Sequence, residues 1–76
     1  MKEADAIKQI IEEFYRAIKL HEPFNSVHEG IAVIEEEYDE LWDEIKKKDS
    51  KRDIDALRKE ASHVAAMGMR FMVDLT

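Results

Sequence analysis

The sequence contains no cysteine, so it has neither a disulfide framework nor a cysteine-based zinc site. Its longest uninterrupted apolar runs span only a few residues, far short of the roughly 20 needed to cross a bilayer. The opening segment MKEADAIKQ also lacks the apolar core of a signal peptide. These absences favour a reducing, cytoplasmic setting and no association with a membrane.

Positive charge is scarce as well, because 12 Lys and Arg stand against 18 Asp and Glu, giving a formal net charge of −6. No surplus of cations is available to displace phosphate counterions, which disfavours binding to nucleic acid. The only basic concentration contains Lys46, Lys47, Lys48, Lys51 and Arg52. We expect it to complement the negative carboxyl end of the preceding helix, in preference to binding phosphate.

With 76 residues, the chain is expected to form one domain, and a domain of this size buries only about 60% of its unfolded surface. Apolar residues recur at threes and fours in three segments, which predicts helices over about residues 3–20, 27–47 and 51–74. The first helix ends before Pro23. The second begins at Ser26, an N-cap with Glu29 as its capping-box partner. The predicted fold class is all-α, a three-helix chain.

The apolar residues of these helices define the expected core. The stripe of the second helix comprises Ile31, Ile34, Tyr38, Leu41 and Ile45. Tyr38 is therefore expected in the core, with Phe24 packed over the connector that precedes this helix. Residues 64–73 of the third helix are apolar almost all round, which predicts burial on more than one side. We expect self-association into a homodimer or homotetramer that completes an oligomeric helical bundle.

One constellation of ionisable residues lies at helical spacing on two segments. Glu37 and Glu40 are three residues apart on the second helix, as are Glu60 and His63 on the third. Both pairs lie beside their own apolar stripe, displaced in the same rotational sense, so antiparallel helices would bring them together. Three carboxylates suit a hard divalent cation, whereas an imidazole shifts the preference toward zinc, iron or manganese. An ordinary acidic flank of a charged helix is the alternative.

These residues resemble the motifs of the MazG-like all-alpha nucleoside triphosphate pyrophosphohydrolases, in which E-x-x-E is followed one helix later by E-x-x-D. The first motif is matched by Glu37-Tyr38-Asp39-Glu40, preceded by Glu36. The second is matched by Glu60-Ala61-Ser62-His63, except at its last position. The segment from Phe24 to Gly30 is also similar, so the resemblance covers about residues 20 to 75.

The resemblance implies a helical homodimer or larger oligomer in which Glu37, Glu40 and Glu60 bind Mg²⁺ or Mn²⁺. Glu36 would assist in ligation or in activating water. The expected reaction cleaves a nucleoside triphosphate between its alpha and beta phosphates. The cation would neutralise the triphosphate and lower the pKa of an attacking water, so that the products are a monophosphate and pyrophosphate.

His63 departs from the motif, because a neutral imidazole adds no negative charge and is a poor ligand for Mg²⁺. It could serve as a catalytic base, orient water, contact phosphate when protonated, or be held by structural hydrogen bonds. Two alternative functions follow. One is a catalytically inactive MazG-like oligomer, and the other is a di-metal bundle holding iron or manganese, because Glu60-x-x-His63 has the spacing of the di-iron carboxylate proteins. For a nucleotide, Phe24 and Tyr38 are candidates to stack on the base.

Overall fold

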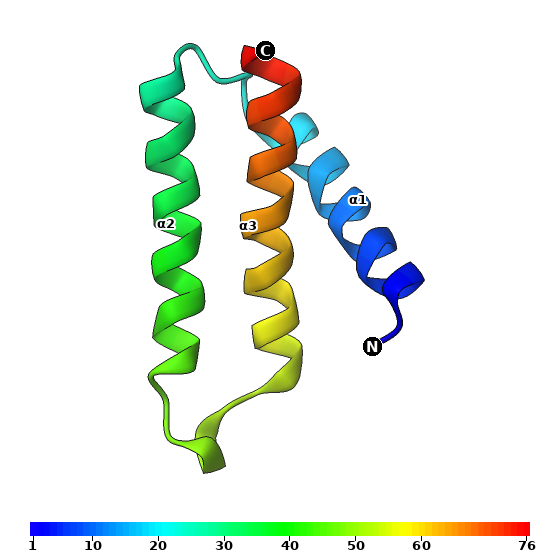
Figure 1. Ribbon diagram of the computed structural model, residues 1–76, viewed down its shortest axis with the longest axis vertical. Coiled ribbons are helices and arrows are strands. Elements are labelled where there is room, and N and C mark those ends of the chain that lie inside the picture. Colours follow the sequence, from blue (N-terminus) through cyan, green and yellow to red (C-terminus); the bar gives the residue numbers. More distant parts are fainter.

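The computed structural model describes residues 1–76. It contains three α-helices, α1 (Glu3–Leu20), α2 (Val27–Ile45) and α3 (Ile54–Leu75), one 3₁₀ turn, η1 (Asp49–Lys51), and no strands. α3 packs against both other helices, whereas α1 and α2 do not pack against each other. In Figure 1, α2 and α3 run side by side in opposite directions, and α1 leans across the other side of α3. The all-α fold class is confirmed.

The first two helices begin where the sequence predicts. The Oγ of Ser26 accepts a hydrogen bond of 3.1 Å from the backbone N–H of Glu29, which confirms this residue as the N-cap of α2. The reciprocal half of the capping box is absent, because the Glu29 carboxylate accepts instead from the Asn25 side-chain amide at 3.3 Å. Glu29 therefore ties the connector to the first turn of α2.

The connection between α2 and α3 is longer than predicted. α2 ends at Ile45 instead of near residue 47, and α3 begins at Ile54 instead of residue 51, because η1 and the cap residue Asp53 occupy the interval. The guanidinium of Arg52 donates a hydrogen bond of 2.8 Å to the carbonyl of Ile45. A residue of the basic segment therefore complements the carboxyl end of α2, as expected from the helix dipole.

The helices bury a narrower face than their apolar stripes suggest. On α2, Ile34 and Leu41 are half-buried, but Ile31 is 56% exposed and Tyr38 is 57% exposed. The prediction that Tyr38 lies in the core is therefore wrong for the single chain, since one neighbouring helix covers only part of a wide apolar sector. Phe24 is buried over the connector, as expected.

The core of the molecule lies along α3, where this helix meets both neighbours. It is formed by a cluster of buried apolar side chains, namely Phe14, Ala17, Phe24, Ala66 and Met67. Gly30 brings the start of α2 close to α3, because a Cβ atom there would lie 2.6 Å from Cδ2 of Phe71. The residue is buried, and the absence of a side chain allows the two helices to meet.

Arg70 of α3 holds the end of α1 and the connector in place. Its side chain is almost completely buried, and its two terminal nitrogens donate hydrogen bonds of 2.9 Å to the carbonyls of Ala17 and His21. Its Nε donates to Asp74 at 3.0 Å, and the same carboxylate oxygen accepts from the backbone N–H of Phe24 at 3.1 Å. Arg70 therefore caps the carboxyl end of α1, where the Ala17 carbonyl also accepts the backbone N–H of His21 at 3.0 Å.

We expect Arg70→Leu to lower the free energy of unfolding by about 3 kcal/mol, because it leaves the buried Asp74 carboxylate without its cation. Urea unfolding monitored by circular dichroism measures the change. Arg58→Leu is the control, since the ion pair of Arg58 with Asp55 is long, at 3.9 Å, and exposed. That change should stay within about 0.5 kcal/mol, and an equal effect of both substitutions would contradict the role of Arg70.

Candidate metal centre

The two halves of the predicted constellation converge. α2 supplies Glu37 and Glu40, α3 supplies Glu60 and His63, and one potential ligand atom from each of the four side chains lies within 4.8 Å of all the others. The antiparallel packing of α2 and α3 produces this arrangement, because equal flanks of two such helices emerge on the same side. Glu40 is exposed, and the other three side chains are half-buried.

The imidazole of His63 lies between carboxylates, and only 13% of its side chain is exposed. Its Nδ1 lies 3.3 Å from Oε2 of Glu37 and 3.6 Å from Oε2 of Glu60. Its Nε2 points the other way and lies 3.2 Å from Oε1 of Glu13. Both ring nitrogens are thus directed at acidic groups, on opposite edges of the ring.

Glu13 and Arg16 of α1 are members of the site that the sequence reading missed. The Glu13 carboxylate accepts two hydrogen bonds from the Arg16 guanidinium, at 2.9 and 2.5 Å, while it contacts His63. A sequence signal for Glu13 exists, because it precedes the buried Phe14 and therefore flanks the inward face of α1. This pattern does not predict that Glu13 reaches His63, since the orientation of α1 relative to α3 depends on contacts between residues far apart in the sequence, such as those of Arg70.

The acids of the cluster are held in an unfavourable environment. Burial raises the pKa of Glu37, and the nearby Glu40 carboxyl raises it further, while His63 acts in the opposite direction. Burial, followed by hydrogen bonding with Glu40, likewise raises the pKa of Glu60. The Arg16 hydrogen bonds lower the pKa of Glu13. The carboxyl groups of Glu37 and Glu60 therefore resist ionisation, whereas the carboxyl group of Glu13 is stabilised in its ionised form.

The residues present fit a divalent cation. Oε2 of Glu37 and Oε2 of Glu60 are buried and have no hydrogen-bond partner, and these are the atoms that lie nearest to Nδ1 of His63. Buried carboxylate oxygens without partners are destabilising unless a cation or proton neutralises them. Together with Nδ1 of His63, these two oxygens supply three donor atoms of a mixed oxygen and nitrogen metal site.

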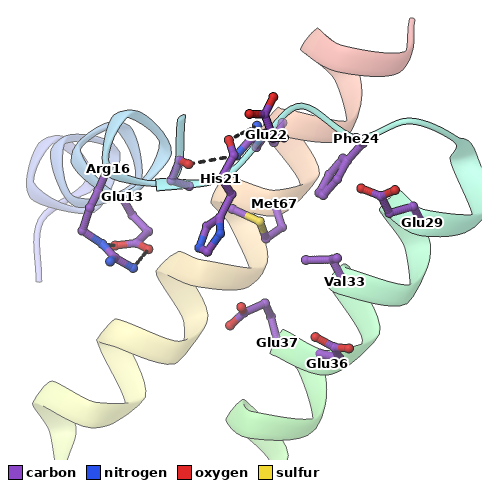
Figure 2. Close-up of a pocket in the computed structure, with 12 residues that line it drawn as sticks. Glu13, Arg16, His21, Glu22, Phe24, Glu29, Val33, Glu36, Glu37 and Met67 are labelled. Carbon is purple, nitrogen blue, oxygen red and sulfur yellow. Dashed lines mark hydrogen bonds and ion pairs between the residues drawn. The ribbon is translucent and has the colours of Figure 1, made fainter. Parts of the chain in front are cut away.

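A cavity of about 420 Å³ opens beside the cluster, between α1, α2 and the connector. Figure 2 shows Glu36 and Glu37 on its α2 wall, Glu13 and Arg16 on its α1 side, and Met67 on α3. Glu36 thus lies at the cavity wall and outside the four-residue cluster. The cavity is large enough for a small molecule that also reaches Glu37.

The lining of this cavity also includes the apolar residues Phe24, Val33 and Met67. A second cavity, of about 370 Å³, lies on the other side of Glu13 and has no hydrophobic lining residue. Arg16 and Lys59 are its cationic members. Glu13 and Arg16 border both cavities, and each cavity also reaches a member of the cluster, Glu37 in the first and His63 in the second.

Comparison of the chain with protein-family models, curated proteins and solved structures gives no significant match. None of the helices combines the length and the apolar character that a membrane span requires. Function is therefore inferred from the geometry of the site, together with the motif resemblance described above.

We expect the metal-free protein to lose stability as the pH rises above 4.5, the ordinary pKa of a glutamate. The pKa values of Glu37 and Glu60 are raised by folding, so the folded chain binds protons more tightly than the unfolded chain. Their contribution to stability is present at low pH and is lost as the pH passes through the raised values. Glu13 has a lowered pKa, so its contribution is lost below pH 4.5 instead.

The substitution Glu37→Gln tests the prediction that the charged Glu37 carboxylate destabilises the metal-free protein. It should raise Tm at pH 7 by about 4–8 °C for each kcal/mol of repulsion relieved, and it should flatten the decline in stability above pH 4.5. The measurement is thermal unfolding in the presence of a chelator. The exposed Glu35→Gln on the same helix is the control and should leave Tm unchanged. A lower Tm for Glu37→Gln at pH 7 would show that the carboxylate stabilises the metal-free fold.

Proposed function

We propose that this chain is a divalent-metal-dependent nucleoside triphosphate pyrophosphohydrolase of the MazG-like type. One observation carries the proposal: Glu37 belongs both to the four-residue cluster and to the wall of the 420 Å³ cavity. A cation held by the cluster would therefore lie at the edge of a space that a nucleotide can enter. The motif resemblance at Glu37, Glu40 and Glu60 supplies the substrate class.

Charge explains why such a site needs a cation. The chain carries a formal net charge of −6, and the cluster adds three carboxylates to the place where a polyphosphate would bind. A bound divalent ion would offset this repulsion and lower the pKa of a coordinated water, which is the chemistry that phosphoanhydride hydrolysis requires. Mg²⁺ and Mn²⁺ are the cations that the resemblance implies.

The proposed roles follow from where each side chain lies. Glu37, Glu40 and Glu60 hold the cation. Glu36 borders the cavity one residue before Glu37 and would assist in ligation or accept a proton from the attacking water. His63 has both nitrogens directed at carboxylates, which favours a role in holding the cluster over that of a free general base.

The substrate would span two chemically different surroundings. In the larger cavity, Phe24, Val33 and Met67 offer apolar contacts that suit the flat, partly apolar surface of a base. Arg16 borders both cavities, and Lys59 borders the polar one, so the phosphates would lie near these cations. Glu13 and Arg16 border both cavities, and Glu37 borders the larger one, so cleavage would occur near these residues.

A non-catalytic relative is the second candidate, and the position of His63 favours it. When it carries a positive charge, this imidazole would offset part of the negative charge of the three carboxylates around it without any metal. The di-metal bundle has weaker support, because di-iron bundles bring two Glu-x-x-His helices to one centre. The exposed apolar side of α2 that a second copy could cover is turned away from Glu40, so a copy bound there would not bring its own Glu60 and His63 to this cluster.

Pyrophosphate release from a panel of common and modified nucleoside triphosphates, with Mg²⁺ and with Mn²⁺, tests the proposal. We expect turnover of at least one substrate and a loss of about 100-fold or more in kcat for Glu37→Gln and Glu60→Gln, because each removes a charged cation ligand. Glu35→Gln, exposed on α2, should retain activity. No release from any nucleotide with either cation would favour the non-catalytic relative.

We also propose that the chain is a homo-oligomer, which is supported by an uncovered apolar side of α2. Ile31, Tyr38, Trp42 and Ile45 are all between 39% and 57% exposed. Their spacing of 7, 11 and 14 residues from the first member places them on one side of the helix. This side is turned away from Glu40, so a second copy could cover it without blocking the cluster.

The substitution Trp42→Glu should weaken the oligomer, because it places a charge at the centre of the proposed contact. Sedimentation velocity across a range of concentrations measures the change, and we expect the apparent dissociation constant to rise by at least about tenfold. The adjacent Asp43→Ala lies off this side of α2 and is the control. A wild-type chain that stays monomeric at high concentration would refute the oligomer.

A further inference from the structure

We propose that Glu13 of α1 is a positioning residue that orients His63 for metal binding and makes the cluster a mixed nitrogen and oxygen site for a transition-metal ion. In this arrangement Nδ1 of His63 is a metal ligand beside Glu37 and Glu60. Such a site prefers Mn²⁺, Fe²⁺ or Zn²⁺ to Mg²⁺. The inference rests on the proposed cation site and is independent of whether the bound protein hydrolyses a nucleotide.

The two ring nitrogens of His63 face different surroundings. Nδ1 faces the unpartnered oxygens of Glu37 and Glu60, at 3.3 and 3.6 Å. Nε2 contacts Oε1 of Glu13 at 3.2 Å, so that a small rotation of either side chain would align a charge-assisted hydrogen bond. In proteins, a metal-bound histidine almost always donates its other ring N–H to a carboxylate, a carbonyl or water. Glu13 stands where that carboxylate is needed.

The four candidate donor atoms lie within 4.8 Å of one another, and the two distances from Nδ1 of His63 can be compared with those in known coordination geometries. Ligands at 2.0–2.1 Å from a four-coordinate metal are separated by roughly 3.3 Å, whereas adjacent ligands of an octahedral ion at the same bond length are roughly 2.9 Å apart. The separations of 3.3 and 3.6 Å between Nδ1 and the two oxygens lie closer to the first value. This geometry favours Zn²⁺ or four-coordinate Co²⁺ as probes.

Glu13 is itself held in one orientation. Arg16 donates to both of its oxygens, at 2.9 and 2.5 Å, and only 14% of the Glu13 side chain is exposed. The guanidinium is more exposed, at 55% of its side chain. A chain of contacts therefore runs from Arg16 through Glu13 to His63, and it fixes which nitrogen faces the cluster. A carboxylate with a fixed orientation is what an outer-shell partner requires.

Titration of the intact protein with Zn²⁺, Mn²⁺ and Mg²⁺ in a calorimeter tests the proposal. We expect Zn²⁺ and Mn²⁺ to bind more tightly than Mg²⁺, and Glu13→Ala to weaken Zn²⁺ binding by about 10–100-fold. Glu13→Gln should recover part of the loss, because its amide oxygen can still accept from Nε2. The adjacent Glu12→Ala is the matched control, since the Glu12 side chain is 64% exposed and should leave the affinity unchanged.

A double-mutant cycle separates orientation of His63 from general disturbance of the fold. His63→Asp replaces the imidazole with a carboxylate and should shift the preference toward Mg²⁺. In that background, Glu13→Ala should change Zn²⁺ affinity by less than about threefold, because no ring remains to be oriented. An equal loss in both backgrounds would reduce Glu13 to a structural residue and overturn the proposal.

Long-range ¹H–¹⁵N spectra of the histidine rings report the bound nitrogen directly in the Zn²⁺ complex. We expect Nδ1 of His63 to carry the metal and Nε2 to carry the proton. Binding through Nε2, or Zn²⁺ binding that leaves the His63 resonances unchanged, would overturn the inference. These readouts need no turnover, so absence of nucleotide hydrolysis would reject the proposed activity while leaving this test intact.

Discussion

α3 must pack against two helices at once, because α1 and α2 each contact it and do not contact each other. A helix with two neighbours needs two apolar sides, which is part of the reason why residues 64–73 are apolar almost all round. The buried Ala66 and Met67 lie in this segment. The same arrangement leaves open the side of α3 that lies between α1 and α2. The cluster and the larger cavity occupy that side.

Periodicity predicted the helices and the convergence of Glu37, Glu40, Glu60 and His63, because both depend on local spacing and on one short connection. The position of α1 could not be predicted in this way. Its carboxyl end is fixed by Arg70, which bonds to carbonyls 49 and 53 residues earlier in the sequence. Glu13 was missed for that reason. The exposure of Tyr38 was not predicted, because the apolar stripe of a helix does not show which of its residues face a neighbouring helix of the same chain. A contact with another copy of the chain would leave the same pattern in the sequence.

The acidic cluster is difficult to explain as a stabilising feature. Burial raises the pKa values of Glu37 and Glu60, and one oxygen of each has no partner, so the metal-free fold retains a destabilising interaction at this point. Glu44 of α2 also has one buried oxygen without a partner, but its other oxygen accepts a hydrogen bond of 2.9 Å from Lys47. The exposed Asp43 is paired with Lys46. Local instability of this kind, concentrated beside a cavity, is typical of functional sites.

Occupation of the cluster would also change the mechanics of the chain. Glu37 and Glu40 belong to α2, Glu60 and His63 to α3, and Glu13 reaches the same place from α1. A cation bound there would therefore link three helices, two of which have no packing contact with each other. Because a ligand that binds only the folded state stabilises it, and more so the tighter it binds, binding of a cation here would be thermodynamically coupled to the arrangement of the helices. His63 would extend this coupling to α1, because its Nε2 contacts Glu13 while its Nδ1 faces the cluster. An aspartate at position 63 has a shorter side chain and no second nitrogen to make the contact with Glu13.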